Sequence, residues 1–401
     1  MSIVRPIQIE AGAARGAPSR PTTAPIRVFH LFRHLGRAGA ELLLVEGLRF
    51  ADRENFHYGY GYVMHGDGVL PEFEALGASL CSFGATSRPG ILAAAGRIAR
   101  HLRDWQADLV HCHLPLVGAA GRLAGRLAGV PVVYTEHNLW ERYHPLTRLA
   151  NRLTWPMQAH VVAVSEQVAR SVRARVADRV PVHVIHNGVD VDRFHRDPDV
   201  GQEMRTRLGV PPTACLVTNV ASFKPQKRLD RWLRAAQLIR RARPDTRFLL
   251  IGGGPKREAM RRLAARLGLS DVVHFIGVQR DVRPYLACTD VFMMSSDFEG
   301  MPVAMLEAMA FECAIVSTPA GGIPEAVTDG RTGLLVPSQA PEEMAAATIA
   351  LLDDPARRRE LGRAARSEVA ERFHMRHMCQ ALERLYAQVM VERGRAAVGA
   401  R

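Results

Sequence analysis

The chain has 401 residues, of which 47% are hydrophobic and 23% are charged, as is typical of a soluble globular protein. This length exceeds one ordinary hydrophobic core and indicates two domains. The formal net charge of +13 favours anionic partners. Nucleic acid is not an expected partner, because aromatic residues make up only 6% of the chain and no nucleic-acid-binding motif accompanies the charge.

Composition also bears on compartment and on metal binding. No stretch reaches the roughly 18–20 apolar residues of a membrane-spanning helix. Residues 1–24 are rich in Pro, Ala, Gly and Arg and lack an apolar signal core, so we expect a disordered tail and a cytoplasmic protein. The six cysteines show no short pairing and read as reduced core residues. His111 and His113 alternate on one strand, but no third ligand is near in sequence, so no metal is expected.

Strands and helices alternate through the first half of the chain. Hydrophobic patterning predicts strands over 26–32, 57–64, 107–114, 130–138 and from 159, with helices over 42–51, 71–80, 91–105, 118–129 and after a Ser165 cap. Ligands of open parallel sheets bind beyond the carboxyl ends of the strands. His113 and His137 stand at two such ends, although a structural role for His137 is the alternative.

Residues 139–155 form a basic, aromatic segment that contains Trp140, Tyr143 and Trp155 among three arginines. Such a segment could lie on an acidic membrane surface or receive an acceptor. The alternative is a solvated helix with one packed face. An Asn187-Gly188 turn closes this half of the chain, and residues 196–212 are expected to be a polar connector.

The second half repeats a strand, loop and helix pattern, and its loops carry the lysines. Only three of the 53 basic residues are lysines: Lys224 and Lys227 in the first loop, and Lys256 after Gly253 in the second. A glycine loop between a strand and a helix is typical of a phosphate-binding turn. We expect all three lysines to face one cleft; codon bias is the alternative explanation.

Residues 295–337 carry the most informative pattern. A buried strand ends at Ser295, Glu299 lies in the following loop, and Pro302 is expected at the first position of a helix that contains Glu307. The free amides of that helix terminus favour an anion. A phosphate beside two hydroxyl-binding carboxylates is the chemistry of a sugar nucleotide, although two surface glutamates remain the alternative.

Glu299 and Glu307 are separated by seven residues within FEGMPVAMLEAMA, and STPAGGIPEAVTDGRTGLLV follows. This stretch resembles the signature of retaining GT-B glycosyltransferases, most closely family 4, the glycosyl transferases group 1. The resemblance implies an α/β fold of two doubly wound, Rossmann-like domains that face an interdomain cleft. The acceptor-side domain would span 25–190, the nucleotide-sugar domain 191–376, and a last helix at 377–391 would pack back on the first.

The same resemblance implies roles for individual residues. Glu307 would bind ribose hydroxyls, Glu299 hydroxyls of the sugar, and Lys227, supported by Lys224, the departing diphosphate. His137 would contact the donor sugar, and amides would cradle phosphate or sugar at Gly300, Met301 and Gly39. Further candidates are, on the donor side, Ser222, Gly253 and Lys256, and, on the acceptor side, Glu41 and His113.

The implied reaction is the retaining transfer of a hexose from a UDP- or GDP-linked sugar to a saccharide or polyprenyl-linked acceptor, without a metal or other cofactor. Cell-envelope or exopolysaccharide synthesis is the implied pathway, at the inner face of the membrane. Two departures stand out: Ala38 replaces a family glycine, and Ser222 replaces a family arginine. These departures would favour one alternative, a non-catalytic, sugar-nucleotide-binding partner of a polysaccharide synthesis complex. A nucleotide-sugar epimerase on the same fold is the other alternative.

Overall fold

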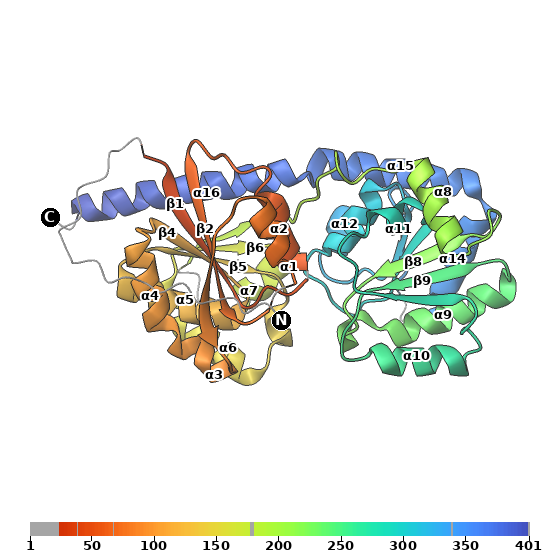
Figure 1. Cartoon of the computed structure of the whole chain (residues 1–401), viewed down its shortest axis with the longest axis horizontal. Coiled ribbons are helices and arrows are strands. Elements are labelled where there is room, and N and C mark those ends of the chain that lie inside the picture. Colours follow the sequence, from red (N-terminus) through yellow and green to blue (C-terminus); the bar gives the residue numbers. More distant parts are fainter. Residues whose placement is uncertain (1–23, 38, 67, 177–179, 338–339, 400–401) are drawn as a thin grey trace.

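The computed structural model describes residues 24–37, 39–66, 68–176, 180–337 and 340–399. The expected tail over 1–24 therefore lies almost wholly outside the described residues, as does Ala38. The described chain forms two lobes side by side, each built on a parallel sheet with helices on both faces (Figure 1).

The first lobe contains a seven-stranded sheet of order β3-β2-β1-β4-β5-β6-β7. The order reverses between β1 and β4, which is the point where doubly wound sheets bind their ligands. The seven strands are β1 (Ile26–Phe32), β2 (Phe56–Met64), β3 (Leu80–Ala85), β4 (Leu109–His113), β5 (Val132–Glu136), β6 (His160–Ala163) and β7 (Val182–Val184).

The second lobe contains a six-stranded sheet of order β10-β9-β8-β11-β12-β13, with the same reversal between β8 and β11. Its strands are near-continuous apolar runs, as expected of parallel strands covered on both faces. They are β8 (Leu216–Val220), β9 (Arg247–Ile251), β10 (Val273–Gly277), β11 (Val291–Met294), β12 (Ala314–Ser317) and β13 (Leu334–Leu335).

Helices connect the strands and cover both sheets. In the first lobe they are α1 (Gly39–Gly47), α2 (Leu70–Ala75), α3 (Arg88–Ala93), α4 (Ala95–Asp104), α5 (Pro115–Ala128), η1 (Trp140–Arg142), α6 (Pro145–Thr154), η2 (Trp155–Met157) and α7 (Glu166–Arg173). After β7 they are α8 (Pro198–Arg207), η3 (Pro225–Lys227), α9 (Leu229–Ala242), α10 (Arg257–Arg266), α11 (Arg283–Ala287), α12 (Val303–Ala310), α13 (Ile323–Ala326), α14 (Pro341–Asp353), α15 (Pro355–Arg372) and α16 (Met375–Gly399).

The last two helices run along one side of both lobes (Figure 1). Helix α15 covers the second sheet, and α16 crosses to the first, where Leu385, Tyr386 and Val389 join the core formed by strand residues such as Leu109. Polar contacts fix the crossing, because Glu383 accepts hydrogen bonds from the backbone N–H of Asp52 and from the Tyr58 hydroxyl. The C-terminal part of the chain therefore packs on the first lobe.

Four local expectations were wrong. The helix expected over 71–80 ends at Ala75, because Gly77 has a left-handed backbone with φ of 72°, and Leu80 already begins β3. The connector over 196–212 contains helix α8, which begins at an Asp197 cap and packs on α11. The helix expected over 91–105 is two helices that meet at Ala94, and the first of them starts earlier, at Arg88, where the Ser87 hydroxyl caps it. Pro302 has an extended backbone with ψ of 112° and is the N-cap, so α12 begins at Val303.

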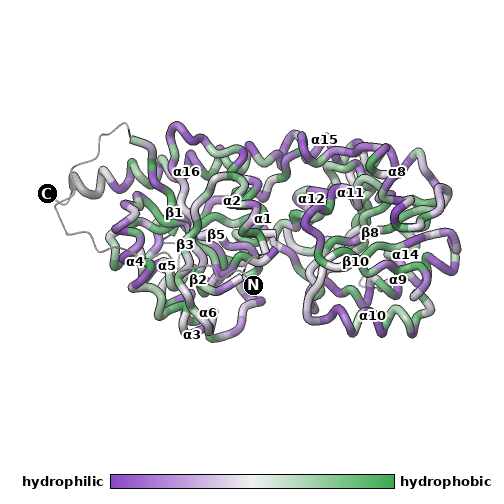
Figure 2. The backbone as a smooth tube through the Cα atoms, in the orientation of Figure 1, coloured by the Kyte–Doolittle hydropathy of each residue, from purple (hydrophilic) through white to green (hydrophobic). Residues whose placement is uncertain are grey.

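Hydropathy follows this architecture: the strands of both sheets run through the apolar interior, whereas α15 is hydrophilic along much of its length (Figure 2). The Ser165 cap of α7 is confirmed, since its hydroxyl accepts a hydrogen bond from the N–H of Val168. Among the described helices, none has both the length and the apolar character to cross a bilayer.

Candidate active site

A cleft of about 470 Å³ lies between the lobes, at the carboxyl ends of strands from both sheets. The first lobe contributes the start of α1 and the loop after β5, and the second contributes the loops after β8, β9, β10 and β11. Nine of the candidates predicted from the sequence line this cleft: Glu299, Lys227, His137, Glu307, Gly300, Met301, Gly39, Gly253 and Ser222.

Glu299 and Lys227 are direct partners in the cleft. The Nζ atom of Lys227 lies 2.6 Å from Oε1 of Glu299, and their side chains are 16% and 7% exposed. The Ser295 hydroxyl positions this pair by donating to the carbonyls of Lys227 and Arg228 at 3.0 and 2.9 Å. An ammonium and a carboxylate held this close orient one another, so each can present its remaining hydrogen-bonding positions to a ligand.

Two glycines fix the backbone on either side of Glu299. A Cβ on Gly300 would stand 2.2 Å from the carbonyl oxygen of His137, so the two lobes approach there as only glycine allows. Gly321 has a left-handed backbone with φ of 65°, and its Cβ would stand 1.8 Å from the carbonyl oxygen of Glu299. The GG pair at 321–322 therefore holds the Glu299 loop against the first lobe.

Glu307 differs from Glu299 in its surroundings. Among the described residues, no side chain forms a hydrogen bond or an ion pair with its carboxylate, which lines the cleft. Burial raises its pKa to about 7, and the charges of Glu46 and Asp281 act in the same direction. A carboxylate with free acceptor positions in a cleft can accept hydrogen bonds from two adjacent hydroxyls of a ligand.

Two helices begin at the cleft and face one another across it. Gly39 is the first residue of α1, and Val303, the first residue of α12, lies beside it. Both helices point their unpaired amides and positive dipole ends at the same space. The amide of Asn187 secures the second terminus from the first lobe by donating to the carbonyl of Met301 at 2.7 Å. This arrangement can bind an anion.

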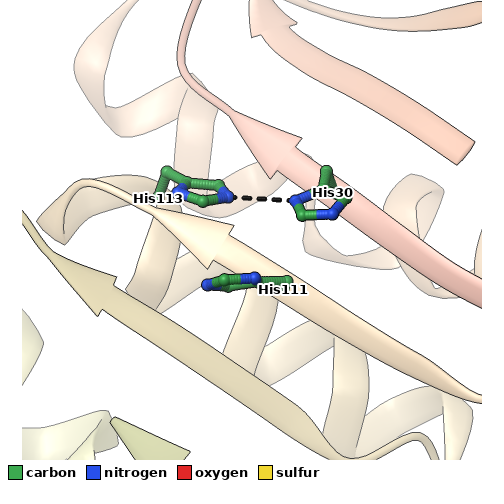
Figure 3. Close-up of side chains that lie close together, drawn as sticks. All are labelled: His30, His111 and His113. Carbon is green, nitrogen blue, oxygen red and sulfur yellow. Dashed lines mark hydrogen bonds between the residues drawn. The ribbon is translucent and has the colours of Figure 1, made fainter. Parts of the chain in front are cut away.

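His137 lies at the end of a chain of buried histidines. Its Nε2 is 3.3 Å from Nδ1 of His113, and Nε2 of His113 is 3.1 Å from Nδ1 of His30 (Figure 3). Burial lowers the pKa of His137 to about 4 and that of His30 to about 3, so the rings are neutral at pH 7. Because each neutral imidazole has one donor and one acceptor, this chain determines which function His137 presents to the cleft.

The third histidine, His30, comes from a different strand and was missed in the sequence. Strand β1 pairs with β4 so that His30 lies opposite His111. The rings of His30, His111 and His113 could surround an ion (Figure 3). However, both nitrogens of His111 already have partners at 2.6 Å, the Tyr386 and Thr135 hydroxyls. A metal would have to break these bonds and the His30–His113 bond.

Four candidates lie outside the cleft lining. Lys256 is exposed at the start of α10, so the three lysines do not converge on one cleft. Lys224 is also exposed, and its charge acts on Glu41 of the first lobe. Glu41 is buried inside α1, and burial raises its pKa to about 7. His113 acts on the cleft only through His137.

Several charged residues of the cleft gave no signal in the sequence. Arg37 ion-pairs with Glu72 and donates to the carbonyl of Arg280 in the other lobe at 3.0 Å. Arg193 likewise pairs with Glu46. Each of these contacts joins residues that are distant along the chain, so no local pattern marks them.

Solved structures with the same architecture are GT-B proteins, which defines the class of this fold. Anabaena Alr3699/HepE in complex with UDP and glucose superposes with a TM-score of 0.82 at 21% identity, covering 90% of this chain and 100% of that chain. WaaG, a glycosyltransferase involved in lipopolysaccharide biosynthesis, gives a TM-score of 0.73 at 16% identity, covering 89% and 98%. The expected GT-B fold with two Rossmann-like lobes is confirmed.

Sequence comparison then identifies the family. Residues 25–193 match the model "Glycosyltransferase Family 4", and residues 201–368 match "Glycosyl transferases group 1". A D-inositol 3-phosphate glycosyltransferase of Streptomyces avermitilis is 34% identical over 73% of this chain and 66% of its own. An alpha-maltose-1-phosphate synthase of Mycolicibacterium smegmatis is 32% identical over 71% and 79%.

The chain therefore belongs to glycosyltransferase family 4, and the resemblance read from Glu299 and Glu307 is confirmed. It is an enzyme that transfers a sugar from a nucleotide sugar.

Proposed function

We propose that the protein transfers a hexose from a nucleoside diphosphate sugar, with retention of configuration, to a saccharide or lipid-linked acceptor of cell-envelope or exopolysaccharide synthesis. The observation that carries this proposal is the cleft, in which the Glu299–Lys227 pair, the unpaired Glu307 carboxylate and two helix termini face one space. Each of these groups matches one part of a sugar nucleotide.

The assignment of parts follows from chemistry and distance. Glu307 accepts hydrogen bonds from the ribose hydroxyls, and the amides at the start of α12 receive a phosphate. Lys227, held by Glu299, neutralises the charge that develops on the leaving diphosphate. Glu299 uses its second oxygen to bind hydroxyls of the hexose near the reacting carbon, and His137 binds the same hexose from the first lobe.

The residues fit a reaction without a bound metal. The cleft supplies a fixed ammonium at Lys227 and helix amides where the diphosphate would sit, and such groups stabilise a leaving phosphate electrostatically. In a same-face attack the leaving phosphate oxygen accepts the acceptor proton as the new bond to the anomeric carbon forms. This chain's residues then bind, orient and neutralise, and no separate general base is assigned.

The donor base and the acceptor rest on relatives. HepE of Anabaena is solved with UDP-glucose, which favours a UDP-linked donor for this chain, with GDP as the alternative. The named relatives act on inositol phosphate or make maltose 1-phosphate, so a phosphorylated acceptor is an alternative to the saccharide or lipid-linked one.

Thermal-shift binding of UDP, GDP, ADP and their common sugars, with and without EDTA, tests the donor site. We expect stabilisation by one nucleotide class, unchanged by EDTA, followed by nucleotide release when an acceptor is supplied. The anomeric configuration of the product, read by NMR, must match that of the donor. Binding without turnover would favour the non-catalytic alternative, and release of a free or epimerised sugar would favour the epimerase. No shift with any nucleotide would refute the proposal.

A further inference from the structure

Helix α6 exposes an apolar face that the fold does not cover. Leu146, Leu149 and Leu153 are 70%, 53% and 68% exposed, and their spacing of three and four residues places them on one side of the helix. Leu127, at the end of the neighbouring helix α5, is 58% exposed. Other large exposed apolar side chains of the described residues, such as Val200 and Val391, lie on α8 and α16.

The opposite face of α6 is polar and buried, so the helix is inverted relative to an ordinary surface helix. Asn151 and Thr154 accept hydrogen bonds from Nη1 of the fully buried Arg122, and Gln158 accepts one from its Nε at 2.6 Å. The Arg122 guanidinium also lies over the Trp155 ring at 5.1 Å. Because Asn151 and Thr154 face the interior, the three leucines on the other side of α6 point toward the solvent.

The charged side chains of the two helices that carry the leucines have one sign. Helices α5 and α6 contain no Asp or Glu, whereas Arg126 and Arg152 are exposed and Arg148 is partly exposed. Arg103 of α4 adds to them, since it donates to the carbonyl of Leu127 at 2.8 Å. Apolar side chains flanked by exposed arginines match a bilayer surface that contains acidic phospholipids, because insertion and charge attraction then act together.

The face is directly connected to the cleft. The chain leaves β5 at His137, forms η1 and then enters α6. At the end of η1, the Arg142 guanidinium lies 4.6 Å from the ring centre of Phe298, the neighbour of Glu299. The segment η1 therefore links the α6 face to the loop that carries Glu299.

We propose that Leu127, Leu146, Leu149 and Leu153, together with Arg126, Arg148 and Arg152, form a docking face for a bilayer that contains acidic phospholipids. Docking also makes the proposed function more specific, because the acceptor would then be lipid-linked and would be reached from the membrane. This one point rests on the proposed function. The binding of the bilayer itself depends only on the leucines and the arginines.

Flotation of the full chain with vesicles tests the proposal. We expect the protein to float with vesicles of phosphatidylcholine mixed with phosphatidylglycerol, and to remain unbound with phosphatidylcholine alone. The variant Leu146→Gln/Leu149→Gln/Leu153→Gln should bind the acidic vesicles about tenfold or more weakly. The matched control Val200→Gln/Val391→Gln, which alters exposed apolar residues elsewhere, should bind as the parent does. Arg148→Gln/Arg152→Gln should weaken binding most at low salt.

A failure of the docking proposal can be distinguished from a failure of the proposed donor site. A nucleotide-induced thermal shift in the leucine variant equal to that of the parent shows that it is folded. If the parent protein bound no nucleotide, the proposed function would be refuted, whereas the proposal that α6 binds a bilayer would be unaffected. Parent protein that fails to float, or a leucine variant that floats as well as the parent, would overturn the docking proposal. A parent dimer that the leucine variant abolishes, without flotation of either, would also overturn it in favour of a second copy on this face.

Discussion

Glu307→Gln is the most direct test of the role of Glu307, because it should raise the stability of the protein and weaken nucleotide binding at the same time. Burial raises the pKa of Glu307 to about 7 from its usual value of 4.5. Between these values the native protein holds a proton that the unfolded chain has released, so the free energy of unfolding falls as pH rises through this window. Glutamine stays neutral and does not incur this loss.

The size of the effect follows from the shift. A full shift from 4.5 to about 7 corresponds to about 3.4 kcal/mol above pH 7. The carboxylate opens into a water-filled cleft that screens part of this energy, so we expect Glu307→Gln to be more stable by ~1–2 kcal/mol at pH 8. At pH 4 the two proteins should be equally stable. Burial also raises the pKa of Glu136 to about 7, but it titrates alike in both proteins and cancels in the difference.

The affinity for the ligand should change with pH in the opposite direction to the stability. Hydroxyl groups donate to the ionised form of Glu307, so the affinity of the parent for its nucleotide should rise about tenfold from pH 6 to pH 8. Glu307→Gln should bind weakly at both pH values. Denaturant unfolding and calorimetric titration at pH 4, 6 and 8 measure the two effects. A variant no more stable than the parent at pH 8, with a nucleotide affinity that still follows pH, would refute the reasoning.

Three further changes test other parts of the site. Lys227→Ala should lower kcat about 10²–10³-fold, because it removes the cation facing the leaving diphosphate. The control Arg359→Ala, which changes an exposed residue of α15, should leave kcat unchanged. Equal kcat values in the two variants would contradict the assignment. Gly321→Ala should lower the free energy of unfolding by about 2–4 kcal/mol, because its new methyl group would clash with the backbone of Glu299. Gly330 has the same left-handed backbone but open space around it, so Gly330→Ala should cost only ~1 kcal/mol. Similar losses in both variants on chemical denaturation would show that backbone strain alone acts. His113→Leu should lower kcat about tenfold, because it removes the hydrogen bond that orients His137. The pH profile of kcat between pH 6 and 8 should not change, since burial lowers the pKa of His113 well below its usual value. A shifted profile would mean that His113 titrates in this range.

Local patterns in the sequence predicted the elements because their signals depend on neighbouring residues. The apolar run before Ser295, the Ser165 cap and the alternation that turns His111 and His113 to one face all appear in the structure. The start of α12 was misplaced by one residue, because nothing in the sequence shows that Pro302 has an extended ψ angle. Residues 196–212 were read as a connector because their polar composition hides a helix that gains its stability from packing on α11.

The sequence by itself determined the family and the two glutamates of the site, since the spacing of Glu299 and Glu307 is a property of one short stretch. Only the tertiary structure decided which lysine meets them: Lys227 reaches Glu299 across 72 positions of the chain, whereas Lys256 lies exposed on α10. It likewise brought His30 to His113 through strand pairing and turned the leucines of α6 outward around a buried Arg122. These contacts join distant segments, and their free energy depends on burial and approach that no local pattern carries.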